Sequence, residues 1–161
     1  MKLPSDYRDA LMRAKRMLDE GNVLGAERIL RHLAETEAYR HIPLEGLADL
    51  YLQQGRIEEC LNILRELTGM APENLNYCVK LANLLDSTGN TDDAIDAYER
   101  LIEHQPDEAI AHFNVALLYK KHLRYADALQ AYEEALRLGI DRADDVYSNI
   151  GNVYAEMLDA D

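Results

Sequence analysis

The chain has 161 residues, of which 48% are hydrophobic and 29% charged, so it can bury a core and remain soluble. Its net charge of −13 repels phosphate backbones and anionic lipid surfaces, which argues against nucleic acid and membrane partners. No apolar run approaches the roughly 18 residues of a membrane span, and the N-terminus has no signal-peptide core, so we expect a cytoplasmic protein.

The distribution of charge and the two cysteines indicate which partners and which redox environment to expect. Residues 1–40 hold eight Lys and Arg against seven Asp and Glu, whereas residues 41–161 hold nine against twenty-three. The acidic part favours basic partners, although a solvated helical surface is the simpler explanation. Cys60 and Cys78 suit reduced, buried thiols, with a single disulfide as the alternative.

A period of 34 residues organises the chain from the N-terminus onward. TDDAIDAYERLI at 91–102 returns as YADALQAYEEAL at 125–136, with two alanines and a tyrosine in one register. Other series at this spacing are Gly21, Gly55 and Gly89, then Tyr51, Leu85 and Tyr119, then Ala26, Cys60, Ala94 and Ala128. The period predicts four repeats and a half repeat, at 7–40, 41–74, 75–108, 109–143 and 144–161.

Each repeat is predicted to be a helix, a tight turn and a second helix. Within 76–86, apolar residues recur at spacings of three and four, which is typical of an amphipathic helix. Gly89 suits a helix C-cap and Thr91 an N-cap for the next helix, which we expect to end near His104. A helix pair of this length cannot bury its apolar face alone, so neighbouring repeats must stack.

This pattern resembles the tetratricopeptide repeat (TPR) family, which has characteristic large, small and aromatic positions on the two helices. The matching residues are Leu44, Leu47, Ala48, Tyr51, Cys60, Leu64 and Pro72, then Cys78, Leu81, Ala82, Leu85, Ala94, Tyr98 and Pro106, then His112, Val115, Ala116, Tyr119, Ala128, Tyr132 and Ala135. Tyr147, Ile150, Gly151 and Tyr154 open a further copy, shifted by one residue. The resemblance implies an all-α fold, a right-handed α-α superhelical solenoid of helix-turn-helix units, with an atypical first repeat as its N-terminal cap.

The half repeat at 144–161 raises a question of its own. Its apolar stripe of Val146, Ile150, Val153, Tyr154 and Met157 has no second helix after it. Either this helix caps the fourth repeat, or the sequence is a fragment of a longer protein, which is the interpretation we favour. The stretch 135–157 also resembles TPR arrays that precede sulfotransferase-like domains in some bacterial proteins, but it contains no phosphosulfate-binding loop.

The TPR resemblance also implies where a partner would bind. In that family a concave groove is lined by fixed positions of the first helices. Carried onto this sequence, the candidate groove residues are Asn76, Val79, Lys80, Asn83, Asp86, Ile110, Phe113, Asn114, Leu117, Lys121, Asn149 and Asn152. Side-chain amides can grip the backbone of an extended peptide, and Phe113 with Leu117 would supply an apolar anchor. We expect Asn114→Ala to weaken binding and to leave stability nearly unchanged.

No pattern of residues predicts chemistry. The five histidines are scattered, without a metal-ligand spacing or a catalytic motif, so we expect no enzyme, no cofactor and no metal. The two-carboxylate clamp of chaperone-binding TPR proteins is also incomplete, which predicts no strong binding of a Glu-Glu-Val-Asp tail.

The sequence therefore predicts a non-catalytic scaffold that binds a protein or peptide segment in its groove. Two alternatives remain. One is an assembly module that forms a homo-oligomer through the C-terminal half repeat. The other is the substrate-docking arm of a larger bacterial enzyme.

Overall fold

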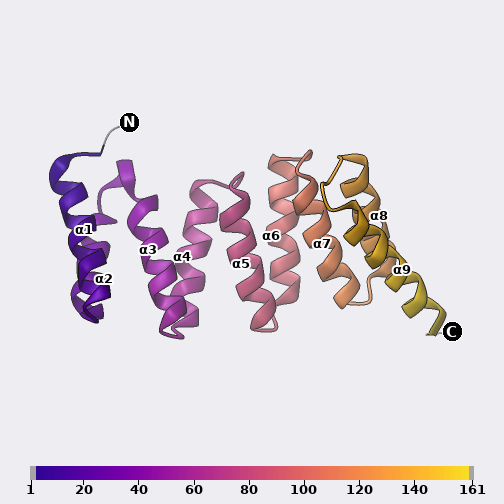
Figure 1. Cartoon of the computed structure of the whole chain (residues 1–161), viewed down its shortest axis with the longest axis horizontal. Helices are drawn as coiled ribbons and strands as arrows, with labels where there is room; N and C mark the ends of the chain where they lie inside the picture. The colour runs from indigo at the N-terminus through magenta and orange to yellow at the C-terminus, as the bar shows by residue number, and fades with distance from the viewer. Residues whose placement is uncertain (1–2, 160–161) are drawn as a thin grey trace. The chain divides into compact units, whose positions relative to one another are not determined.

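Figure 1 shows the computed structural model, which describes residues 3–159 and within that range consists of helices joined by turns and loops, with no strand. The helices are α1 (Ser5–Asp19), α2 (Val23–Leu33), α3 (His41–Gln53), α4 (Ile57–Met70), α5 (Leu75–Ser87), α6 (Thr91–His104), α7 (Ala109–Lys121), α8 (Tyr125–Arg137) and α9 (Ala143–Asp159), with a 3-10 turn at Glu37–Tyr39. The all-α fold predicted from the 34-residue period is confirmed.

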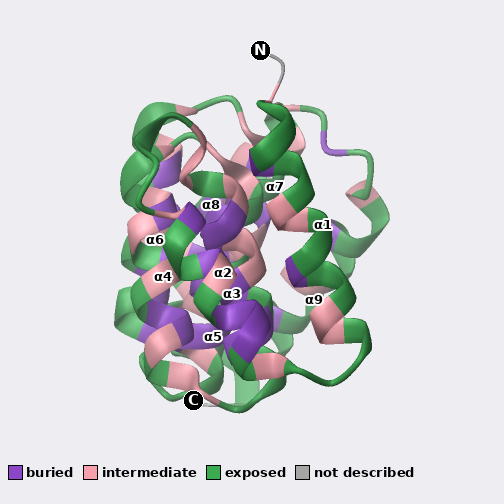
Figure 2. Cartoon of the chain, turned by 90° about the vertical axis from the view of Figure 1, so that its left-hand side faces the viewer, coloured by how far each residue is buried: buried purple, intermediate pink, exposed green. Residues whose placement is uncertain are grey.

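The helices form two compact units, which we call the N-terminal unit (Met1–Met70) and the C-terminal unit (Ala71–Asp161). In the N-terminal unit, α1 packs on α2, α2 on α3, and α3 on α4. In the C-terminal unit the same succession runs from α5 through α8 to α9. In Figure 2 the buried residues follow the sides of the helices that face other helices. Stacked hairpins thus bury together what one hairpin leaves exposed.

The small residues that recur with the 34-residue period lie in the core. Ala26, Ala94 and Ala128 are fully buried, and Cys60 is 1% exposed. Both cysteines are buried and neither forms a disulfide. The Cys60 thiol lies 3.3 Å from the carbonyl oxygen of Ala48 and donates to it, so this position packs like a small apolar residue.

The turn inside each hairpin depends on a left-handed residue after the first helix. Gly21, Gly55 and Gly89 have φ of 77°, 68° and 84°, as the C-cap prediction requires. In the fourth hairpin, Leu123 stands where the period would place glycine, and it takes φ 58°. The geometry of the turn is therefore kept even where the residue that favours it is missing.

The N-cap prediction for Thr91 was wrong. Thr91 is the first residue of α6, preceded by Asn90 as the cap, and its side chain is buried. Its hydroxyl donates a 2.7 Å hydrogen bond to Asp86 Oδ1 on α5 instead of capping its own helix. A hydroxyl at a hairpin turn can bond across the turn as easily as along the chain, and the sequence pattern does not distinguish the two.

The last helix packs on the fourth hairpin. Val146 and Val153 of α9 are fully buried, and α9 contacts α8. The rest of the predicted stripe is less buried, because Ile150 is half-buried, Tyr154 is 52% exposed and Met157 is 40% exposed. None of the described helices has the length and apolar character needed to cross a bilayer.

Candidate functional site

Three first helices of the C-terminal unit are joined by side-chain contacts along one face. Lys121 Nζ on α7 lies 2.8 Å from both carboxylate oxygens of Asp86 on α5. Lys120 Nζ on α7 donates a 3.2 Å hydrogen bond to Asn149 Oδ1 on α9. Because these side chains reach from one first helix to the next, α5, α7 and α9 present adjacent surfaces. We call this surface the first-helix face.

Most of the candidate groove residues reach solvent on this face. Those that are exposed are Asn76, Lys80, Asn83, Ile110, Lys121 and Asn152. Those that are half-buried are Val79, Asp86, Asn114, Leu117 and Asn149. Phe113 is the exception.

The expectation that Phe113 anchors a partner requires correction. Its side chain is 4% exposed, and its ring packs at a tilt against Tyr132, with centroids 5.9 Å apart. The guanidinium of Arg142 covers the ring at 5.4 Å from its centroid. Protein interiors are closely packed, so an apolar side chain at the edge of a binding face can turn inward and fill a gap between helices. Phe113 does so.

Asn114 is bound within the fold. Its side-chain amide is hydrogen-bonded to the hydroxyl of Tyr98, which is 2% exposed. Truncating Asn114 would leave that buried hydroxyl without this partner, at a cost of about 1–3 kcal/mol. The expectation that Asn114→Ala leaves stability nearly unchanged is therefore replaced by its opposite.

Three more candidates, Asp86, Lys121 and Asn149, form polar contacts with neighbouring helices. Asp86 accepts from both Lys121 and Thr91, so the Asp86–Lys121 pair joins two repeats. Asn149 accepts from Lys120 through Oδ1 and donates from Nδ2 to the backbone oxygen of Asp145, at 2.9 Å. These residues hold the first-helix face in shape, which is a positioning role.

The remaining candidates on this face combine amide and apolar character. They are Asn76, Val79, Asn83, Ile110, Leu117 and Asn152. Ile110 is 46% exposed, so this face presents a large apolar side chain to solvent. This surface can hydrogen-bond a peptide backbone and shield an apolar side chain, and it offers no group arranged for covalent chemistry.

A polar network in the N-terminal unit was missed by the sequence reasoning. Glu27 on α2 is 9% exposed and accepts from the Tyr51 hydroxyl at 2.9 Å and from Arg56 Nη1 at 2.8 Å. The Arg56 guanidinium also lies over the Tyr51 ring, 4.2 Å from its centroid. The hydrogen bond from Arg56 lowers the pKa of Glu27 to about 2, so this carboxylate stays ionised.

A similar network lies two repeats later. Tyr119 donates to Glu99 Oε1 at 2.5 Å, Arg124 lies 4.3 Å from the centre of its ring, and Arg124 Nε pairs with Asp127 at 2.7 Å. The Tyr, Arg and acidic residue at 51, 56 and 59 thus recur at 119, 124 and 127. That recurrence was the available signal. The networks join neighbouring hairpins and are structural.

The described residues contain no group of three or more His, Cys, Asp or Glu side chains placed to hold a metal ion. Burial raises the pKa of the Cys78 thiol to about 12, which disfavours a nucleophilic thiolate at that position.

Two family models match the sequence. The tetratricopeptide repeat model covers residues 79–145, and the bacterial transcriptional activator domain model covers residues 7–110. The activator domain model covers more than half of the chain, so the chain belongs to the family of the bacterial transcriptional activator domain, and its residues 79–145 match the tetratricopeptide repeat model. Among curated proteins, no sequence relative matches it.

Several solved structures share this fold. A tetratricopeptide repeat protein from Parabacteroides merdae has 20% identity and a TM-score of 0.76, over 95% of this chain and 62% of that one. The MamA protein has 19% identity and a TM-score of 0.70, over 92% and 81%. MamA from Desulfovibrio magneticus has 16% identity and a TM-score of 0.71, over 98% and 89%. This chain thus spans less than two thirds of the Parabacteroides structure, and at these identities the likeness shows the fold alone.

Proposed function

We propose that the protein is a non-catalytic scaffold that binds an extended protein segment on the first-helix face of its C-terminal unit. The observation that carries the proposal is the set of exposed amides beside an exposed isoleucine on adjacent first helices. Asn83 and Asn76 come from α5, Ile110 from α7 and Asn152 from α9. Side-chain amides can hydrogen-bond the backbone of a peptide of any sequence. Ile110 adds an apolar contact, which would favour peptides with an apolar side chain at the matching position.

The charge supports a protein partner over a nucleic acid, because the chain carries −13. The match over residues 7–110 makes proteins of bacterial transcription the first partners to test. We also propose a cytoplasmic location, consistent with the reduced thiols.

The test begins with twelve-residue peptides selected from a random display library, followed by calorimetric titration of the best binder. We expect Asn83→Ala and Ile110→Ser each to weaken binding by about tenfold, equivalent to roughly 1.4 kcal/mol. Asp96→Ala on α6 is the matched control, because Asp96 is exposed and lies on a second helix. Unchanged affinity in both face variants, or a loss in the control, would place the binding site elsewhere.

A further inference from the structure

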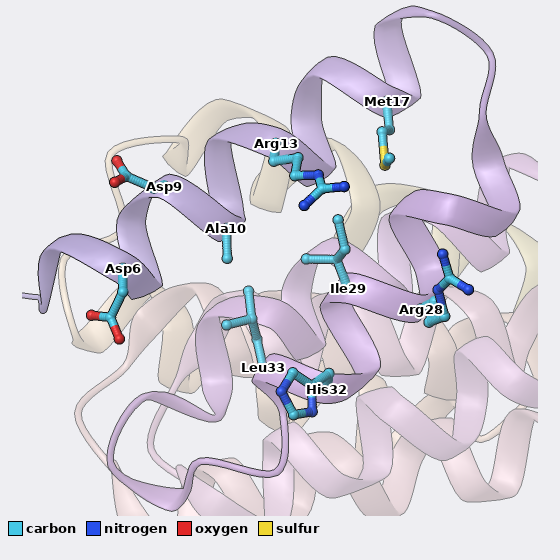
Figure 3. A pocket seen from close by; sticks show the side chains of 9 residues that line it. All are labelled: Asp6, Asp9, Ala10, Arg13, Met17, Arg28, Ile29, His32 and Leu33. Carbon is cyan, nitrogen blue, oxygen red and sulfur yellow. The ribbon is translucent and has the colours of Figure 1, made fainter.

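The outer side of the first hairpin carries a groove between α1 and α2. It encloses about 630 Å³ and is lined by Asp6, Asp9, Ala10, Arg13, Met17, Arg28, Ile29, His32 and Leu33. In Figure 3, Ala10, Ile29 and Leu33 point into the space between the two helices, and Arg13 extends into the same space. The groove therefore has an apolar floor and a charged rim that includes two arginines and two aspartates.

At the other end of the chain, α9 exposes a row of apolar residues that differs from the stripe predicted from the sequence, and from here on we call this exposed row the stripe. Tyr147 is 63% exposed, Tyr154 is 52% exposed and Leu158 is 77% exposed. With Gly151 they follow the spacing i, i+4, i+7 and i+11, so they lie along one side of the helix. The residues 35 positions earlier on α7 include His112, Ala116 and Tyr119, which are buried or half-buried where α8 packs on α7. On α9 no described helix covers this side.

The stripe and the groove match in length. The groove follows α1 from Asp6 to Met17, and the stripe runs from Tyr147 to Leu158, so each covers twelve residues and eleven steps along its helix. At 1.5 Å per residue both extend for about 16 Å. A helix that places its apolar side in a groove of this kind uses the same anchor spacing that α9 offers.

Charge identifies the occupant. The helix α9 carries Asp144, Asp145, Glu156 and Asp159 and contains no Lys or Arg. Residues 1–40 are the part of the chain with an excess of cations, whereas residues 41–161 hold twenty-three acids against nine bases. Pairing α9 with a second α9 would bring eight carboxylates together. The groove balances Arg13 and Arg28 against Asp6 and Asp9, so it lacks the acidic excess of residues 41–161 and repels α9 less than another α9 would.

We infer that α9 of one molecule docks into the α1–α2 groove of a second copy. Tyr147, Tyr154 and Leu158 fill the apolar floor, and the acidic residues of α9 lie beside Arg13 and Arg28. The contact is heterologous, so in a dimer one molecule still has a free groove and the other a free stripe. Further copies can therefore add at both ends. It uses none of the residues proposed for peptide binding, so either proposal can fail alone.

The test is light scattering coupled to size-exclusion chromatography on the full chain, over a hundredfold concentration range. We expect the mass to rise above the monomer's 18.3 kDa with concentration and to fall back as salt is added. A mass that stays monomeric throughout, or a species that stops at a dimer, overturns the inference.

Two variants and their mixture sharpen this test. Tyr154→Glu with Leu158→Glu removes the stripe, and Arg13→Glu with Arg28→Glu removes the acceptor. We expect each variant to be monomeric alone and the equimolar mixture to form a one-to-one dimer, since one intact stripe then meets one intact groove. If the groove variant associates by itself, α9 pairs with something other than the groove and the inference fails.

All substituted side chains are exposed, and circular dichroism checks that helicity is retained. Tyr154→Ser is a milder stripe variant, expected to weaken association by about tenfold, close to the loss of one interfacial anchor. The matched control is Leu52→Glu, which removes a leucine 51% exposed on α3 outside both surfaces and is expected to associate like the natural sequence.

Discussion

Tyr98 and Tyr132 occupy the same repeat position, 34 residues apart, and have different hydrogen-bonding environments. Both side chains are buried, but Tyr98 is hydrogen-bonded to Asn114, whereas the Tyr132 hydroxyl has no partner among the described residues. Burial raises the pKa of Tyr132 to about 12, so the hydroxyl remains neutral. A buried hydroxyl without a partner opposes folding, and one with a partner supports it.

Removing the two hydroxyls should therefore have unequal effects. We expect Tyr98→Phe to lower the free energy of unfolding by about 1 kcal/mol, and Tyr132→Phe to leave it unchanged or raise it slightly. Urea unfolding measures both. Combining Tyr98→Phe with Asn114→Ala should cost less than the sum of the single changes, because both remove the same bond. Equal losses for the two tyrosine variants would contradict this account.

Repetition explains why the elements could be predicted and the site only in part. The 34-residue period fixes helices, turns and small core positions, since every repeat must solve the same packing problem. Whether a side-chain amide faces solvent or a neighbouring helix depends on one local partner. Asn114 and Asn149 meet such partners in Tyr98 and Lys120, and Phe113 turns inward beside Tyr132. The period says nothing about these encounters.

In the turn of the fourth hairpin, leucine stands at the position where the 34-residue period predicts glycine. Leu123 holds φ 58° in the place of glycine and its side chain is 68% exposed, so little packing offsets the strain. The left-handed region costs an L-residue about 1–2 kcal/mol, part of which is offset by the flexibility of glycine in the unfolded chain. We expect Leu123→Gly to stabilise the protein by about 0.5–1 kcal/mol in urea unfolding.

Leu123→Ala separates strain from exposure. It removes the exposed side chain and keeps the cost of positive φ, so its stability should stay close to that of the natural sequence. If alanine stabilises as much as glycine, the turn is not strained.

The Glu27 network joins the first and second hairpins, and its contribution to stability depends on pH. Because the folded-state pKa of Glu27 is lowered to about 2, its contribution is fully present above the unfolded-state value, near 4.5, and is lost as pH falls toward 2. We expect Glu27→Gln to reduce stability at pH 7 by about 1–3 kcal/mol, as for hydrogen bonds to charged groups.

Thermal unfolding followed by circular dichroism at pH 7 and pH 3 measures this dependence. The difference in Tm between Glu27→Gln and the natural sequence should be largest at pH 7 and should shrink at pH 3. Glu58→Gln, an exposed position on α4, is the control and should show little difference at either pH. A difference that grows on acidification would rule out Glu27 as the ionised centre of the network.

At the scale of the whole molecule, stability in a repeat protein is a sum of local terms, so the N-terminal and C-terminal units can open with different free energies. A change confined to one unit, such as Glu27→Gln, should lower the stability of that unit most. A single melting curve averages over both units and does not separate them.

The two buried cysteines supply a separate reporter for each unit. Cys60 lies in the N-terminal unit and Cys78 in the C-terminal unit, and each thiol donates to a backbone carbonyl oxygen, of Ala48 and Ala97 respectively. An aromatic disulfide reagent can reach each sulfur only when its surroundings open, so the two labelling rates time two local events in one unmodified chain. In Glu27→Gln, mass spectrometry of the labelled peptides should find Cys60 reacting sooner while Cys78 keeps its pace.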